Sequence, residues 1–312
     1  LGTAHTEYYL SSQETLDVIP SLADMYSEPF ADSSQIPTYL VSALAKRDVT
    51  VCLSGDAGDE LFGGYNRYQW GPRVWRSGQT LPKLFRLSLG TALQSLSPAI
   101  LNNLTRFLPQ QLAFPVMGDQ LQKIAFIMNC ADLDKVYETL VSIDLKSEQS
   151  VINAQPLSTW ADSEFLHFSK FDRQTSPVHN MMFRDIVGYL CDDILTKVDR
   201  ASMATSLETR IPMLDHRVAK LAWSLPANMK IRNGKGKWIL RQILHKHVPL
   251  NLIERPKQGF SIPLNNWLCG PLQDWAEDLL TAKNYLECLE THRSWVTLKS
   301  LEEGSLSIQT FY

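Results

Sequence analysis

Val49–Tyr65 has the sequence VTVCLSGDAGDELFGGY, and this stretch decides the fold class. Its opening run, VTVCL, is apolar and rich in valine, which predicts a short strand. Ser54-Gly55 then predicts a tight turn that opens a helix. Ligands of open α/β sheets bind beyond the carboxyl ends of the strands. The turn at Ser54-Gly55 is therefore the first candidate for a functional site.

Three acidic residues follow this turn, Asp56, Asp59 and Glu60. If the helix begins near Asp56, spacings of three and four residues place all three on one helical face. Carboxylates that lie so close raise one another's pKa values, and a bound divalent cation removes the conflict. Because Mg²⁺ prefers oxygen ligands, the acidic turn predicts a Mg²⁺ site.

The whole-chain composition is that of a globular protein, with 312 residues, 44% hydrophobic and 20% charged. A net charge of -3 gives no electrostatic case for nucleic acid or an anionic membrane. No apolar run approaches the roughly 20 residues that span a bilayer. Five scattered cysteines without a CxxC pair are typical of reduced thiols. We therefore expect a cytoplasmic protein that binds neither nucleic acid nor membranes.

Strand and helix signals alternate before the acidic turn. Residues 6–10, TEYYL, predict a short strand, and Ser11 or Ser12 can cap a helix after it. Ser33 or Ser34 can cap a second helix before the strand at Val49. This order favours an α/β fold with a parallel sheet and crossover helices. Beyond residue 70, apolar residues recur mainly at helical spacing, which predicts a large, predominantly helical remainder.

Two later segments have both a functional and a structural interpretation. Residues 191–217, CDDILTKVDRASMATSLETRIPMLDHR, carry charges of alternating sign that form either ion pairs or part of a site. Lys237 lies in the first turn of a predicted helix, where a cation opposes the helix dipole, so it is either solvated or functional. Arg255 and Lys257 belong to a basic loop that either meets an anionic substrate or is only solvated.

Four motifs occur in a fixed order: SGDAGDELFGGY, DDILTKVDRASMATSLETRIPMLDHR, GKGKWILRQIL and RPKQGFSIPL. Together they resemble the synthetase domain of glutamine-dependent asparagine synthetases, and the resemblance runs from LGTAHTE to NNWL. It implies a parallel sheet of the adenine-nucleotide alpha-hydrolase-like (PP-loop ATP pyrophosphatase) type. It also implies one synthetase domain over residues 1–312, in which residues up to about 70 belong to the nucleotide-binding sheet and residues 71–312 complete the active site.

The resemblance implies an ATP- and Mg²⁺-dependent amidotransferase. A carboxylate, aspartate in the members that give the family its name, attacks ATP to give an acyl-adenylate and pyrophosphate. Ammonia from an N-terminal glutaminase domain then displaces AMP. Alternatives are amidation of another acid such as a sugar acid, a β-lactam synthetase-like cyclisation, or an inactive scaffold. The substrate acid stays open, as does the oligomeric state, for which a homodimer is one candidate.

The resemblance places nucleotide and metal contacts in the acidic turn. Ser54 and Gly55 match positions where the strand end meets the nucleotide. Asp59 matches the aspartate that helps to hold Mg²⁺ and pyrophosphate, with Glu60 beside it. These four residues are the expected ATP and Mg²⁺ contacts.

The resemblance also implies three catalytic residues. Lys237 matches a lysine at the reacting phosphate, where adenylation develops negative charge that an ammonium can stabilise. Asp56 matches an acidic position of the ammonia step, in which a base must take a proton from the attacking nitrogen. Asp193 matches a further acidic position of the active site.

The chain departs from the family pattern in three ways. The SGGxDS phosphate loop and the nucleophilic cysteine of the glutaminase domain are absent, so we expect Leu1 to follow that loop in a longer chain and the fragment alone to be inactive. Asp56 stands where well-known members have glutamate. No Lys or Arg lies between Glu28 and Ala45, where aspartate-specific members carry an arginine. The reaction class is therefore implied more firmly than aspartate as the substrate.

Overall fold

The structure is a computed structural model that describes residues 2–96, 100, 117–142, 176–254 and 262–281. The chain divides into two compact units, residues 1–68 with 173–262 and residues 69–172 with 263–311. The described residues are mostly helical with a small parallel sheet, which is compatible with the predicted α/β class. The acidic turn, Asp193 and Lys237 all belong to the first unit.

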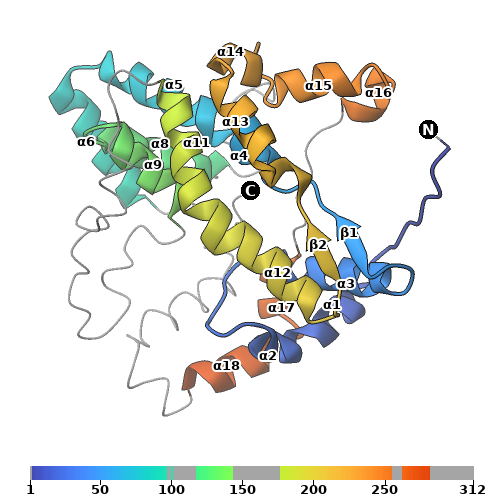
Figure 1. Cartoon of the computed structure of the whole chain (residues 1–312). Helices are drawn as coiled ribbons and strands as arrows, with labels where there is room; N and C mark the ends of the chain where they lie inside the picture. Colours follow the sequence, from blue (N-terminus) through green and yellow to red (C-terminus); the bar gives the residue numbers. More distant parts are fainter. Residues whose placement is uncertain (1, 97–99, 101–116, 143–175, 255–261, 282–312) are drawn as a thin grey trace. The chain divides into compact units, whose positions relative to one another are not determined.

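The sheet of the first unit consists of β1 (Val51–Leu53) and β2 (Glu208–Arg210), which run parallel side by side (Figure 1). Val51 pairs with Glu208, and Leu53 pairs with Arg210. The ladder extends one residue further, because the N–H of Ser54 donates to the carbonyl of Arg210 at 2.9 Å. The strand predicted before the acidic turn is therefore confirmed, and β2 fixes the position where the turn begins.

The strand predicted over residues 6–10 is wrong, because these residues form neither strand nor helix. Tyr8 and Tyr9, which favoured a strand, are 41% and 84% exposed. β-propensity reflects packing against a neighbouring strand more than an intrinsic backbone preference. Without such a neighbour, the tyrosines of this segment do not produce a strand.

The first helices begin close to where the sequence predicts. At the start of α1 (Ser12–Val18), Ser11 Oγ accepts the N–H of Glu14 at 3.2 Å, and the Glu14 carboxylate accepts the N–H of Ser11 at 2.9 Å. This reciprocal pair is a capping box. The helices that follow are η1 (Ile19–Ser21), α2 (Leu22–Met25) and α3 (Gln35–Lys46).

A run of consecutive helices leads to β2 (Figure 1). It consists of α11 (Pro177–Val187), the π-helix η4 (Leu190–Leu195) and α12 (Thr196–Met203), and α12 packs against α3. π-helical turns are rare and occur frequently at functional sites. The turn in η4 carries Asp193, one of the predicted catalytic residues.

Short helices follow β2. Asp215 caps α13 by accepting the N–H of Arg217 at 2.8 Å. The predicted helix at Lys237 is confirmed as α15, with Lys237 at its N-cap. In chain order these elements are η5 (Pro212–Leu214), α13 (His216–Ser224), α14 (Ala227–Lys230), α15 (Trp238–Leu244) and α16 (Leu250–Ile253).

A hydrophobic cluster anchors the acidic turn to the π-helix. Ala57 and the α4 (Gly58–Phe62) residues Leu61 and Phe62 are buried with Leu190 and Ile194 of η4. Each side chain is less than a tenth exposed. Because burying each such side chain contributes about 1.5–3 kcal/mol, this contact holds the turn and the π-helix together.

The second unit is helical in its described part. Its core residues include Ile127 and Val136, both 0% exposed. Gly90 of α6 allows α8 to approach, since a Cβ there would lie 2.2 Å from Asn129 Oδ1. α5 (Arg67–Gln79) begins in the first unit and belongs to the second from Gln69 onward. The other helices are α6 (Lys83–Ser95), α8 (Met117–Asn129), α9 (Leu133–Val141), α17 (Leu264–Leu268) and α18 (Gln273–Thr281).

The described part of the chain also bears on the membrane and cysteine predictions. Among the described helices, none is both long enough and apolar enough to cross a bilayer. The four described cysteines are free thiols, and they are Cys52, Cys130, Cys191 and Cys269.

Candidate active site

The acidic turn leaves β1 through a left-handed residue. Ala57 has φ 64°, and α4 begins only at Gly58. The hydroxyl of Ser54 hydrogen-bonds to the carboxylate of Asp56, which holds that acid at the end of the strand. Asp56 therefore precedes the helix, and the prediction that the three acids share one helical face is wrong. The left-handed turn at Ala57 causes the difference.

Asp59 and Lys237 form the central pair of the site. Lys237 Nζ lies 3.0 Å from Asp59 Oδ2, with the two side chains 33% and 24% exposed. The N–H of Lys237 also donates to the carbonyl of Phe62 at 3.0 Å, so the backbones of α4 and the α15 N-terminus are tied together. Asp59 and Lys237 lie far apart in the sequence, and the fold brings their side chains together between α4 and the start of α15.

The backbone of Lys237 is strained. Its φ of 54° and ψ of 33° place a long side chain in the left-handed region. A non-glycine residue there costs on the order of 1–3 kcal/mol, and such strain concentrates at functional sites. The surrounding contacts therefore hold Lys237 in this conformation despite the free-energy cost of its left-handed backbone.

Two glycines permit this close approach. A Cβ on Gly64 would lie 1.8 Å from Asp59 Oδ1 and 2.5 Å from Lys237 Cε. A Cβ on Gly236 would lie 2.3 Å from the carbonyl oxygen of Gly63. By contrast, a Cβ on Gly55 would meet nothing within 4 Å. The backbone thus approaches the pair closely at Gly64, whereas the strand end at Gly55 has open space for a ligand.

Glu60 lies in different surroundings from Asp59. Its side chain is 1% exposed, and the hydroxyl of Tyr65 donates to Glu60 Oε1 at 2.6 Å. Burial raises the pKa of the Glu60 carboxyl above its usual range, and the hydrogen bond from Tyr65 partly opposes this effect. The sequence analysis predicts Glu60 as a Mg²⁺ ligand, and this buried, hydrogen-bonded arrangement does not favour that role.

A cation enclosed by aromatic rings supports Glu60 and Tyr65. The Arg67 guanidinium lies 4.0 Å from the centre of the Tyr65 ring and 4.7 Å from that of Tyr189. Arg67 Nε donates to Asp185 at 3.0 Å, and Asp185 is 0% exposed. The sequence analysis missed this network. Its only local signal is the cluster of aromatic and basic residues directly after the double glycine, and nothing in the sequence indicates Asp185 as the partner.

Asp193 lies in a separate acidic cluster. The neighbours that act on its carboxyl are Asp32, Lys197 and Tyr189. Burial and the nearby Asp32 carboxylate raise the pKa of Asp193 to about 6. Asp193 is thus not placed directly on the Asp59–Lys237 pair, but its π-helix packs against the turn that carries Asp59.

The predicted residues thus fall into four groups. Asp59 contacts Lys237, Ser54 contacts Asp56 next to Gly55, Glu60 accepts from Tyr65, and Asp193 lies with Asp32. The predicted basic loop, including Arg255 and Lys257, lies outside the described residues. The charged segment 191–217 has both of the predicted roles: Asp193 belongs to the candidate site, whereas other charges form exposed ion pairs such as Arg217–Asp215 and Arg210–Glu208.

The donor set at the turn suits Mg²⁺ only together with a phosphate ligand. Within the described part of the chain, no group of three or more His, Cys, Asp or Glu side chains is arranged to hold a metal ion. Mg²⁺ is usually bound by one or two carboxylates plus substrate phosphates. Asp59 supplies one carboxylate beside the Lys237 ammonium, so the residues fit a Mg²⁺–phosphate group better than a bare cation.

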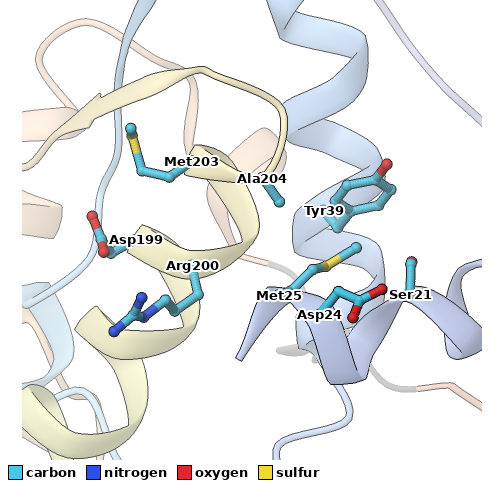
Figure 2. Close-up of a pocket in the computed structure, with 8 residues that line it drawn as sticks. All are labelled: Ser21, Asp24, Met25, Tyr39, Asp199, Arg200, Met203 and Ala204. Atoms are coloured by element: carbon cyan, nitrogen blue, oxygen red, sulfur yellow. The ribbon is translucent and has the colours of Figure 1, made fainter. Parts of the chain in front are cut away.

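A pocket of about 700 Å³ lies elsewhere in the first unit, between α12 on one side and α2 and α3 on the other (Figure 2). It contains none of the predicted site residues. Its lining mixes one cation and two acids with apolar groups, which indicates no particular ligand. The lining residues are Ser21, Asp24, Met25, Tyr39, Asp199, Arg200, Met203 and Ala204.

Comparisons with known proteins identify relatives along the whole chain. The sequence model of the asparagine synthase family matches residues 1–303. Glutamine-hydrolyzing asparagine synthetase 1 of Bacillus subtilis is 29% identical over 332 aligned residues, which cover 100% of this chain and 49% of that protein. A putative glutamine-hydrolyzing asparagine synthetase of Mycobacterium tuberculosis is 31% identical over 88% of this chain and 39% of its own length. The chain spans about half or less of these relatives.

Proposed function

Because this chain belongs to the asparagine synthase family, we propose that it is the synthetase part of an ATP-dependent amidotransferase. In this proposal the whole protein adenylates a carboxylate and converts it into an amide, with aspartate as the leading substrate. The observation that supports this most is the pair formed by Lys237 Nζ and Asp59 Oδ2 at 3.0 Å. It places a fixed ammonium and a carboxylate at the end of a parallel strand.

The geometry of the turn supports the roles that we propose for adenylation. Lys237 stabilises the negative charge that develops on the α-phosphate, because a fixed ammonium needs little rearrangement when the charge appears. Asp59 would hold Mg²⁺, which would neutralise charge on the phosphates. Ser54 and Gly55 border the open space where the nucleotide would lie. We propose the adenine-nucleotide alpha-hydrolase-like fold for this part of the protein.

The amide-forming step needs a group that takes a proton from the attacking nitrogen. Asp56 and Asp193 are the proposed acceptors, since each is a carboxylate on or against the acidic turn. The relatives named above are described as glutamine-hydrolyzing, which supports glutamine as the source of the ammonia. We place that hydrolysis in a separate glutaminase domain and the enzyme in the cytoplasm.

The proposal is tested by ATP–pyrophosphate exchange with the full-length protein. The reaction is measured with Mg²⁺ and one carboxylic acid at a time: aspartate, sugar acids, and amino acids that can cyclise to a β-lactam. We expect exchange that depends on one of these acids, and aspartate is the first choice. If only a sugar acid supports exchange, that acid replaces aspartate as the proposed substrate. If no acid supports exchange, the proposed function is contradicted.

A further inference from the structure

A buried carboxylate, Asp32, and a half-buried one, Asp193, lie near the same lysine. Lys197 Nζ lies 2.6 Å from Asp32 Oδ2, and the two side chains are 9% and 6% exposed. The carboxyl of Asp193 hydrogen-bonds to Asp32, and Tyr189 donates a further hydrogen bond to Asp193. Burial and the nearby charges of Asp32 and Asp193 raise the pKa of Tyr26, the residue that follows α2. The cluster therefore contains two acids and a single cation, so it can take up one proton between the acids.

The hydrogen bonds show which acid holds that proton. Asp32 Oδ1 accepts both the N–H of Ser34 at 2.8 Å and its hydroxyl at 2.7 Å, while Asp32 Oδ2 accepts Lys197. Three donors to one carboxylate favour its ionised form. A hydrogen bond between two carboxyl groups requires a proton on one of them, so a proton that the pair takes up belongs to Asp193.

Asp193 also has a free acceptor. Its Oδ1 is buried and has no hydrogen-bond partner. The residue next to it, Ile194, packs with Leu190 against Ala57 and Leu61 of the acidic turn. The unpartnered oxygen thus belongs to the helix that directly contacts the element carrying Asp59.

We propose that Asp32 is a positioning residue for Asp193, and that the pair accepts the proton released when an amine attacks the acyl-adenylate. This inference rests on the proposed function. In the step, the C–N bond forms, the bond from the acyl carbon to the AMP oxygen breaks, and AMP leaves with that electron pair. Asp193 is ionised before the step, and one N–H proton passes to its carboxylate, which then holds it in a hydrogen bond to Asp32. No oxidant or reductant is needed.

Asp32 makes Asp193 a better proton acceptor than an ordinary aspartate. A like charge close by disfavours the ionised form of its neighbour, so Asp193 binds a proton more tightly than it would alone. The efficiency of a general base is highest when its pKa lies near the working pH. Lys197 opposes this effect only in part, because its charge is shared with Asp32.

The first test measures Asp193 itself and is independent of catalysis. Full-length protein with ¹³C-labelled aspartate carboxyls is titrated by NMR, and the Asp193 signal is identified by its loss in Asp193→Asn. We expect titration near pH 6 in the native protein and about one unit lower in Asp32→Asn. The control Asp192→Asn changes an exposed acid on the same helix and leaves the titration unchanged. An unshifted Asp193 in Asp32→Asn overturns the proposal.

The second test separates positioning from a merely structural role. Amide formation from ammonium salts is measured against pH, with ATP–pyrophosphate exchange measured in parallel. In Asp32→Asn the acid limb of amide formation moves to lower pH, whereas exchange, which has no amine proton to remove, shows no such movement. An acid limb that stays in place refutes the proton transfer. Absence of exchange in the native protein would instead refute the proposed function, and the NMR result would still decide the role of Asp32.

A second variant covers the case in which Asp32→Asn does not fold. Asp32→Asn combined with Lys197→Met removes both members of the buried pair, so no charge is left without its partner. Because Asp32 acts on Asp193 through both its charge and a hydrogen bond, whereas Lys197 acts through its charge alone, the titration still moves to lower pH. An upward movement in the double variant overturns the proposal.

Discussion

Replacing Gly64 by alanine would disturb the Asp59–Lys237 pair directly. The new Cβ would lie 1.8 Å from Asp59 Oδ1 and 2.5 Å from Lys237 Cε, whereas ordinary contacts begin at 3.4 Å. The backbone of Gly64 itself is not in the left-handed region, so steric overlap is the only direct effect. One or both charged side chains must therefore move by more than an ångström.

The expected effect on activity is larger than the effect on stability. Overpacking of this kind costs about 1–3 kcal/mol of unfolding free energy. A misplacement of about 1 Å at a reacting centre costs about 100-fold in rate. We therefore expect Gly64→Ala in the full-length protein to lower ATP–pyrophosphate exchange by about 100-fold while the protein still folds. Circular dichroism and thermal unfolding establish the folded state before the rate is measured.

Gly58→Ala provides the matched control. It lies in the same segment, and its Cβ would meet Lys237 Nζ at 3.8 Å, an ordinary contact. Alanine in a helix is more favourable than glycine by roughly 0.5–1 kcal/mol, so this variant should unfold at the same or a higher temperature. Native exchange rates in Gly64→Ala, or equal losses in both variants, would refute the assigned geometry.

Three further predictions concern the surroundings of the pair. Lys237→Gly should be more stable than Lys237→Ala by about 1 kcal/mol in urea unfolding, because glycine adopts φ 54° without a steric penalty. Arg67→Met leaves the buried Asp185 without its cation and should cost about 3–5 kcal/mol, whereas Arg210→Met, at an exposed pair, should cost less than about 1 kcal/mol. Burial raises the pKa of Glu60, so the native fold loses stability as pH rises from 4.5 through the folded pKa, and Glu60→Gln removes this loss.

Each of these predictions has a clear contrary outcome. Equal urea midpoints for the two Lys237 variants would show that its left-handed backbone is not strained. A small effect of Arg67→Met, comparable with that of Arg210→Met, would show that the aromatic enclosure does not depend on the cation. Thermal unfolding of Glu60→Gln across the same pH range should diverge upward from the native protein, and parallel curves would refute the burial effect.

Local patterns in the sequence predicted the elements that depend on neighbouring residues. The possible N-cap at Ser11 or Ser12 placed α1, and the apolar run before Ser54 placed β1. The segment TEYYL failed because a strand needs a partner that a local pattern does not contain. The prediction that Asp56, Asp59 and Glu60 share one helical face was wrong, because the left-handed backbone at Ala57 makes the helix begin only at Gly58. Alanine rarely adopts this conformation, so the sequence contains no indication of it.

The candidate site could be predicted only as a set of separate residues. The resemblance singled out Asp59 and Lys237, and the fold brings them within 3.0 Å. It did not indicate that Glu60 would be paired with Tyr65 instead of facing the same side. The Lys197–Asp32 pair joins residues 165 positions apart, and no spacing rule connects them. Tertiary contacts of this kind decide protonation and strain, and they become visible only in the structure.

The most direct test of the account is the role of the Lys237 ammonium. Full-length Lys237→Ala is compared with Lys235→Ala, which removes a neighbouring lysine whose side chain is 55% exposed and paired with Glu254. ATP–pyrophosphate exchange should fall by about 100-fold or more in Lys237→Ala, the scale for losing one charge-stabilising donor. It should stay close to native in Lys235→Ala. An almost unchanged exchange rate in folded Lys237→Ala would contradict the central claim.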